Sequence, residues 1–175
     1  SSEDQRKIAD AKKLLSGNDT LFLVLSVNAW YQGRYICWSS RKTSNVNDGY
    51  SHNITYYVTN QNSTRKAELV SRYAIWYAFM WGRNPTITLQ ADRKREPAIR
   101  KDYHLVEAEP NCLVIGLIRE NPSDTICLYF VAENSIKKNR TRCNTAYKTK
   151  CKVATGVKYS WRRHCNRQNR PKLNN

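Results

Sequence analysis

The chain has 175 residues and carries 30 Lys and Arg against 14 Asp and Glu, so its formal net charge is +16 at neutral pH. This length suits one domain with a real core and is short for two. The longest clear apolar run, Leu21–Val27, is far shorter than the roughly 18 residues of a membrane-spanning helix. These properties predict a single domain without such a helix.

The start of the chain has the pattern of a short amphipathic helix. Acidic residues come first, Ile8, Ala11, Leu14 and Leu15 follow at helical spacing, and Gly17 ends the pattern. The opening SSEDQRK is not a signal peptide, so we expect the mature form of a processed chain.

From Thr20 onward the pattern changes to strands separated by Asn, Asp, Gly and Pro. A second helix is expected at 140–154 and a last short strand at 156–161. Sequential strands with a helix at each end, and no alternation of strand and helix, predict a mainly β, antiparallel up-and-down barrel. A barrel of eight strands is wide enough for one small ligand. The eight expected strands are 20–30, 34–40, 52–60, 68–82, 86–91, 103–109, 112–118 and 125–133.

Two cysteines flank the expected turn at Asn121–Asp124. A hairpin centred on this turn places Cys112 opposite a residue near 133 and Cys127 opposite one near 118. The two sulfurs would then lie on the order of 30 Å apart, whereas a disulfide requires Cα atoms within about 7 Å. Each cysteine must therefore pair elsewhere.

The six cysteines come with four N-x-Ser/Thr sequons, at Asn18, Asn53, Asn62 and Asn139. Together they predict an oxidising, secretory compartment and a glycosylated, secreted protein.

Positive charge is concentrated at the end of the chain, because 13 of the 30 Lys and Arg follow Glu133 and no Asp or Glu does. This asymmetry predicts an anionic partner such as a glycosaminoglycan or an acidic cell surface. The alternative is a solubilising, partly disordered tail, which is what we expect of residues 167–175. The candidate residues for the anionic partner are Lys148, Lys150, Lys152, Arg162 and Arg163.

The inward face of strand 68–82 is inferred from its alternation. One face carries Glu68 and Arg72, and the other carries no charge and more aromatic residues. We therefore expect the uncharged face, with Tyr73, Ile75, Tyr77 and Phe79, to point into the barrel, together with Leu105 and Glu107 of strand 103–109. A shift of one residue would reverse this assignment.

The chain resembles the tick salivary lipocalins that include the histamine-binding proteins. The matching features are the helix motif at Asp10–Leu14, Cys37 in RYICWSS, Cys112 in YHLVEAEPNCLVIGL, and Cys143 with Cys165 further on. The resemblance implies a single eight-stranded lipocalin domain, residues 1–166. It also implies the disulfides Cys37–Cys165 and Cys112–Cys143, which leave Cys127 and Cys151 as the third pair.

The resemblance also implies a ligand inside the barrel. Histamine-binding relatives neutralise an amine with acidic residues there, but Asn28 and Cys127 fall where two of these acids would be expected, leaving Glu107 and, less directly, Glu68. A lipid such as a fatty acid, eicosanoid or sterol therefore competes with an amine as the expected ligand; Arg34 or Arg72 would meet a carboxylate head group. The alternative is a barrel filled by its own aromatic side chains. The expected ligand-binding residues are Trp30, Tyr35, Glu68, Arg72, Tyr73, Ile75, Tyr77, Phe79, Leu105, Glu107, Leu117 and Leu128.

Neither catalysis nor a metal or cofactor is expected. His52, His104 and His164 are scattered, no catalytic motif is present, and the late cysteines lack Cys-x-x-Cys spacing. The resemblance implies a secreted, monomeric protein that sequesters a small host inflammatory mediator. The rival hypothesis is a protein whose basic C-terminal face binds a glycosaminoglycan or a host immune protein, with the barrel as scaffold.

Overall fold

The computed structural model describes residues 1–29, 35–60, 63–91, 101–152 and 158–165. Helix α1 (Ser2–Ser16) begins after Ser1, whose Oγ accepts a hydrogen bond from the N–H of Asp4 at 3.2 Å and so caps the first turn. Its apolar face is buried as predicted. None of the described helices has the length and apolar character needed to cross a membrane.

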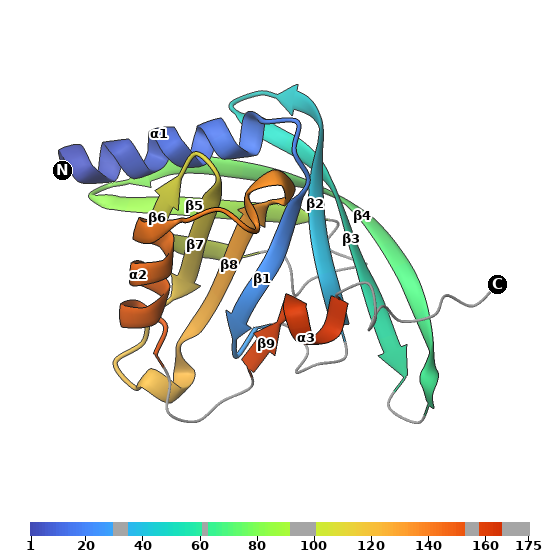
Figure 1. Cartoon of the computed structure of the whole chain (residues 1–175). Coiled ribbons are helices and arrows are strands. Elements are labelled where there is room, and N and C mark those ends of the chain that lie inside the picture. The colour runs from blue at the N-terminus through green and yellow to red at the C-terminus, as the bar shows by residue number, and fades with distance from the viewer. Residues whose placement is uncertain (30–34, 61–62, 92–100, 153–157, 166–175) are drawn as a thin grey trace.

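The strands form one antiparallel sheet that closes into a barrel, because β1 pairs with both β8 and β2 (Figure 1). This confirms the predicted eight-stranded barrel, and a short ninth strand extends it beside β1. The β2–β3 turn has the sequence Asn-Asp-Gly, with Asp48 at a φ of 57°. The strands are β1 (Leu21–Val27), β2 (Tyr35–Val46), β3 (Gly49–Asn60), β4 (Ser63–Trp81), β5 (Asn84–Ala91), β6 (Lys101–Glu109), β7 (Cys112–Leu117), β8 (Ile126–Ala132) and β9 (Lys158–Ser160).

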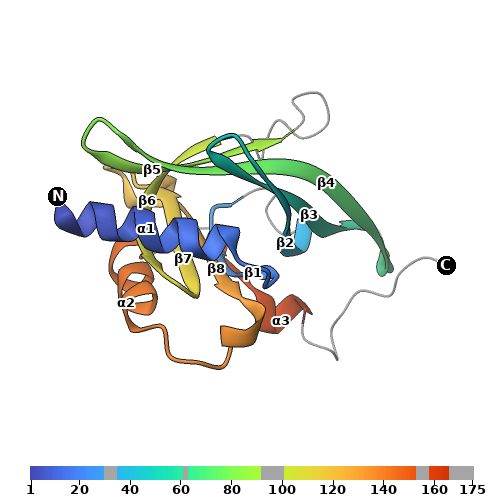
Figure 2. The same cartoon turned by 90° about the horizontal axis from the view of Figure 1, so that it is seen from above.

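Helix α1 lies across one end of the barrel (Figures 1 and 2). Its Ile8, Ala11, Leu14 and Leu15 belong to the same apolar cluster as the inward side chains of the strands. We call this the closed end, and the opposite end, where β1 finishes and β2 begins, the open end. The helix covers the closed end because its single apolar stripe can be buried only against the barrel interior.

A second apolar cluster lies outside the barrel wall, under helix α2 (Thr141–Lys150). It includes Val114 and Val131, whereas their neighbours Leu113 and Phe130 face the interior. Strands β7 and β8 are therefore buried on both faces, which explains why they are apolar at almost every position. The short helix α3 (Trp161–Cys165) contacts β1 and β2.

All three disulfides are present as the resemblance implied. Their Cα–Cα distances are 5.5 Å for Cys37–Cys165, 6.5 Å for Cys112–Cys143 and 5.9 Å for Cys127–Cys151. Cys112 and Cys127 do not pair with each other, as their positions in the hairpin predicted; they lie opposite Val131 and Gly116. A Cβ on Gly116 would come within 2.5 Å of the carbonyl oxygen of Ile126, so only glycine fits beside this bridge.

The predicted inward face of β4 is wrong. Ala74, Trp76 and Ala78 are almost fully buried, whereas Tyr73 is 57% exposed. The absence of charge misled the assignment, because Arg72 lies on the inward face opposite Ile54, nearer the open end of the barrel. The outward face carries the residues predicted to be inside, and these are exposed or half-buried there: Leu69, Tyr73, Ile75, Tyr77 and Phe79.

Candidate functional site

The inner wall of the barrel carries several aromatic side chains. The rings of Trp38 and Tyr56 stack with centroids 4.1 Å apart, and Tyr35 lies 5.3 Å from Tyr56 on the side of the open end. Across the barrel, Trp76 meets Phe130 edge to face at 5.5 Å. These rings come from β2, β3, β4 and β8, and except for the partly buried Tyr35 they belong to the buried interior cluster.

A buried hydrogen-bond chain joins this wall to α1. His52 Nε2 lies 2.8 Å from the carbonyl oxygen of Leu15 and therefore donates to it, so Nδ1 accepts from the Ser40 hydroxyl, also at 2.8 Å. Ser40 Oγ in turn accepts from Trp76 Nε1 at 3.0 Å. Burial lowers the pKa of His52 to about 4, so the ring is neutral at physiological pH. The chain anchors the last turn of α1 on the barrel.

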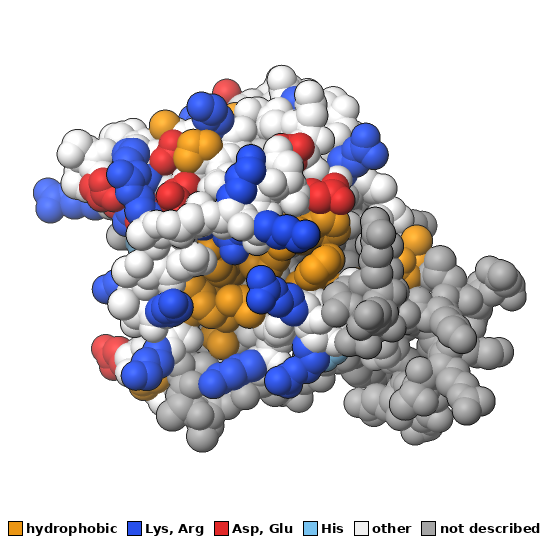
Figure 3. All heavy atoms as spheres, viewed as in Figure 1, with side chains coloured by type: hydrophobic (Ala, Val, Ile, Leu, Met, Phe, Trp, Pro, Cys, Tyr) orange, Lys and Arg blue, Asp and Glu red, His pale blue; other side chains and the backbone are white. Residues whose placement is uncertain are grey.

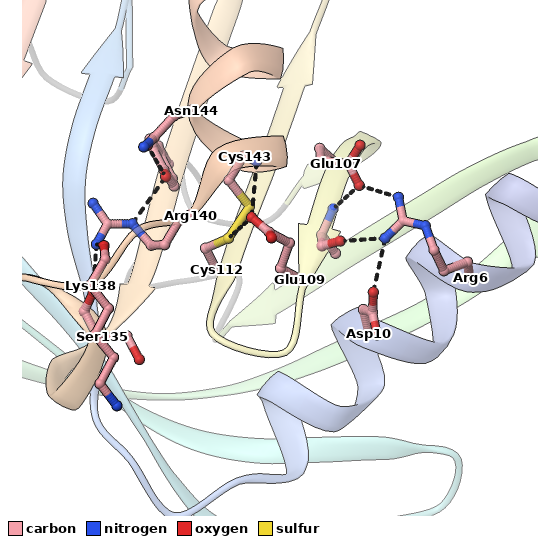
Figure 4. The surroundings of a disulfide bond; sticks show 12 residues. Arg6, Asp10, Glu107, Glu109, Cys112, Ser135, Lys138, Arg140, Cys143 and Asn144 are labelled. Carbon is pink, nitrogen blue, oxygen red and sulfur yellow. Dashed lines mark hydrogen bonds and ion pairs between the residues drawn. A yellow bond between two sulfur atoms is a disulfide. The ribbon is translucent and has the colours of Figure 1, made fainter.

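Glu107 was predicted to point into the barrel, and this is wrong. A β-bulge between Leu105 and Glu107 places it opposite Val114, on the outer face of the wall, where Arg6 of α1 pairs with its carboxylate (Figure 4). Glu107 Oε1 accepts from Arg6 at 2.5 Å and from the backbone N–H of Ala108 at 2.9 Å. Arg6 also donates to Asp10 at 2.9 Å and to the Ala108 carbonyl at 2.8 Å. Hydrogen bonds, first with Glu3 and then with Glu107, raise the pKa of Arg6 further, so it stays charged. Glu107 thus takes part in fastening α1 to β6.

Apolar side chains at the open end are less buried than those deeper in the barrel. Val58, Val70 and Leu117 pack against the apolar cluster but are only partly buried, as is Tyr35. Arg72 lies on the inward face here, and Glu68 lies opposite Val58 with its side chain exposed. Leu105 and Leu128 are fully buried deeper in the wall. Trp30 and Arg34 lie outside the described residues.

Helix α2 is fastened to the outside of the barrel by more than its disulfides (Figure 4). Glu109 accepts a hydrogen bond from the backbone N–H of Cys143 at 3.2 Å, which places a carboxylate at the first turn of the helix, where it is stabilising. Tyr129 donates to Asn144 at 2.6 Å and accepts from Arg140 at 3.1 Å. Glu109 lies close to Cys112 and Cys143, but these sulfurs are bonded to each other, so this group is a structural bridge.

The basic residues predicted from the sequence come together only in part. Lys148, Lys152 and Arg163 border a hollow of about 410 Å³ between α2, β9 and α3, and Arg162 borders an adjoining hollow of about 230 Å³. Lys150 borders neither one. On this face an apolar area is ringed by Lys and Arg side chains (Figure 3).

Several residues outside the predicted set also contribute to this face. Lys158 borders the larger hollow with Tyr147 and Tyr159, and Arg140 borders the smaller one. The two tyrosines are largely buried, and burial raises the pKa of both hydroxyls, so they stay neutral. A possible signal was the interleaving of tyrosine with lysine in AYKTK and VKYSW.

Comparisons with known proteins agree with this architecture. A family model described as tick histamine binding protein matches residues 1–167, and no curated protein matches the chain. Among solved structures, Japanin from Rhipicephalus appendiculatus bound to cholesterol is similar with a TM-score of 0.61, at 15% identity, over 84% of this chain and 93% of that chain.

Two crustacyanin structures are similar as well. Lobster apocrustacyanin A1 has a TM-score of 0.51 at 15% identity, and apocrustacyanin C2 has a TM-score of 0.50 at 14% identity. Each comparison covers 91% of this chain and 85% of the other. At such identities the solved structures establish the lipocalin fold, and the match to the family model over residues 1–167 establishes that the chain belongs to the tick histamine-binding protein family of lipocalin-type ligand-binding proteins.

Proposed function

We propose that the protein is secreted and captures a small apolar molecule in the open half of its barrel. The observation that carries this proposal is the difference in side-chain burial between the middle of the barrel and its open end. The interior is lined mainly by apolar and aromatic side chains, and at the open end Tyr35, Val58, Val70 and Leu117 are only partly buried. Partly buried apolar side chains around a barrel mouth are the lining that a lipid or sterol requires.

An amine is the second candidate, and the family to which the chain belongs favours it. A buried ammonium group needs a carboxylate to offset its desolvation. Glu107 lies on the outer face and is paired with Arg6, and Glu68 is exposed at the mouth. The positions of these two carboxylates therefore favour an apolar ligand over histamine or serotonin.

Arg72 supports a ligand with an acidic head group. It lies on the inward face of β4, one inward position closer to the open end than the buried Ala74. A guanidinium group at this level would pair with the carboxylate of a fatty acid or eicosanoid whose hydrocarbon chain lies against Tyr35 and Val70. A sterol would use the same apolar wall without this ion pair.

The mechanism is stoichiometric capture. One preformed barrel holds one ligand and lowers its free concentration without turnover. In a tick salivary setting, which the family suggests, the ligand would be a host inflammatory mediator and its removal would weaken the host response. Asn18, Asn53 and Asn139 are exposed, which would make three of the sequons available for glycosylation in a secretory pathway.

Native mass spectrometry of the secreted, deglycosylated protein tests the proposal. The protein is analysed as purified and after incubation with cholesterol, arachidonic acid, histamine and serotonin. We expect one cholesterol or arachidonic acid per chain and no retained amine. Retention of histamine or serotonin alone would overturn the apolar assignment, and retention of none of the four would overturn capture of either class.

A further inference from the structure

The larger hollow on the outer face combines an apolar floor with a positively charged rim. Its apolar lining comes from Leu25 and Val27 of β1, Tyr147 of α2 and Cys151, whereas Tyr159, which also borders it, packs against the interior cluster. Its rim carries Lys148 at the end of α2, Lys152 just after that helix, and Lys158 on β9, all of them exposed. Leu25, Val27, Tyr147 and Cys151 belong to or pack against the outer apolar cluster, so this part of the groove is distinct from the barrel interior.

The rim has no carboxylate of its own. No Asp or Glu follows Glu133 in the sequence, and within the described parts of the chain no ion pair joins Lys148, Lys152 or Lys158 to an acid. Positive groups gathered without counter-charges repel one another and attract anions. The charge of the groove is therefore complementary to an acidic ligand.

Covalent bridges hold the walls of the groove in place. Cys127–Cys151 fixes the end of α2 to β8, and Cys37–Cys165 fixes the end of α3 to β2. The hydroxyl of Tyr159 accepts a hydrogen bond from the Cys37 N–H at 3.0 Å. A groove whose walls are set before binding loses little conformational entropy when a partner docks.

The groove continues past α3. The smaller hollow shares Leu25 and Ser160 with the larger one and adds Trp161, Arg140 and Arg162. Its shape and lining fit an extended chain that presents both apolar and acidic groups. A sulfated glycan lacks the apolar group that this lining would accommodate, and a membrane surface would meet the exposed lysines rather than the half-buried Tyr147.

We propose that this outer groove binds an acidic peptide segment of a partner protein, with an aromatic or aliphatic side chain against Leu25, Val27 and Tyr147 and carboxylates at Lys148, Lys152 and Lys158. This activity is independent of ligand capture in the barrel. The two would allow one molecule to hold a small mediator and a protein at the same time.

Isothermal titration calorimetry with synthetic peptides tests this site. The probe is a nine-residue peptide with a central Tyr or Leu flanked by Asp and Glu, and the comparison peptide has Ser at the centre. We expect the first peptide to bind, the Ser peptide to bind at least fivefold more weakly, and both affinities to fall as salt is raised.

The matched variants are Lys148→Gln/Lys152→Gln/Lys158→Gln and the control Lys12→Gln/Lys13→Gln/Arg83→Gln, which removes the same charge from exposed positions elsewhere. The first should weaken peptide binding at least tenfold and the control less than twofold. Equal loss in both variants, no binding of either peptide, or binding only of heparin or phosphatidylserine vesicles would overturn the proposal. A variant with a blocked barrel should still bind the peptide, so failure of this site and failure of ligand capture are distinguishable.

Discussion

The two ends of the barrel are held together in different ways. At the closed end α1 packs its apolar face into the interior, and its backbone and side chains are tied to the wall through His52 and Glu107. At the open end two of the three disulfides, Cys37–Cys165 and Cys127–Cys151, join the starts of β2 and β8 to the C-terminal segment from outside.

This difference has a functional consequence. Packing and hydrogen bonds stabilise the closed end by burying the side chains of α1 against the interior wall. External bridges can stabilise the open end without placing side chains in the interior. Substitutions at the closed end should therefore mainly change stability, and substitutions at the open end should mainly change ligand binding.

The largest expected effect is on the closed end. Trp76→Ala removes a fully buried ring and its hydrogen bond to Ser40, and should lower the free energy of unfolding by about 3–5 kcal/mol. Trp81→Ala is the control, because Trp81 is 70% exposed, and it should change stability by less than about 0.5 kcal/mol. Urea denaturation followed by circular dichroism measures both. Similar losses in the two variants would contradict the assignment of the inward face of β4.

Removing disulfides compares the ends directly. Cys127→Ser/Cys151→Ser and Cys112→Ser/Cys143→Ser open loops of similar length, with sequence separations of 24 and 31, so each should cost about 3 kcal/mol of stability. Only the first pair holds the wall near the open end, so only its removal should weaken ligand binding in a calorimetric titration. Equal losses of affinity would remove the distinction between the ends.

The histidine chain predicts a pH dependence of the closed end. His52 has a folded-state pKa of about 4, below its ordinary value near 6.5, so the folded protein binds fewer protons than the unfolded chain between these values. Stability should therefore fall by up to about 3 kcal/mol as pH drops from 6.5 to 4. Burial also lowers the pKa of His104 and adds in the same direction.

Thermal unfolding at intervals between pH 7 and 4 measures this dependence in the parent chain and in His52→Gln. The variant should be less stable at pH 7 and should show a shallower slope. An unchanged slope would mean that His52 does not carry the effect.

The smallest expected effect is on the affinity for a ligand with an acidic head group at the open end. Arg72→Gln should weaken binding of arachidonic acid about tenfold, as expected for loss of one charge-assisted pair, and leave cholesterol binding unchanged. Arg83→Gln, in the exposed β4–β5 turn, is the matched control. Titration calorimetry with both ligands decides whether Arg72 faces the ligand.

Much of the fold follows from local patterns in the sequence. The expected strands, the spacing of Ile8 to Leu15 and the resemblance in the cysteine framework predicted the barrel, the helix and the pairing. The face of β4 could not be assigned from charge alone, since a strand that reaches the open end can carry charges on its inward side there. The better signal was the alternation of small and large residues at Ala74, Trp76 and Ala78, which is typical of a crowded barrel interior.

The site was harder to predict than the fold, because its residues are defined by long-range contacts. Strict alternation from Leu105 would place Glu107 inside the barrel, but a β-bulge between the two residues turns it outward, where it pairs with Arg6, 101 positions away in the chain. Lys158 and Tyr159 join the basic face only because β9 pairs with β1.

The most direct test of ligand capture at the open end compares two neighbouring residues of β4. Val70 lies on the inward face opposite Tyr56, and Leu69 points outward and is 47% exposed. Titration of cholesterol and arachidonic acid into Val70→Trp and Leu69→Trp should show binding abolished in the first variant and retained in the second, with both variants folded by circular dichroism. Binding retained in Val70→Trp, or lost equally in both, would contradict ligand capture in the open half of the barrel.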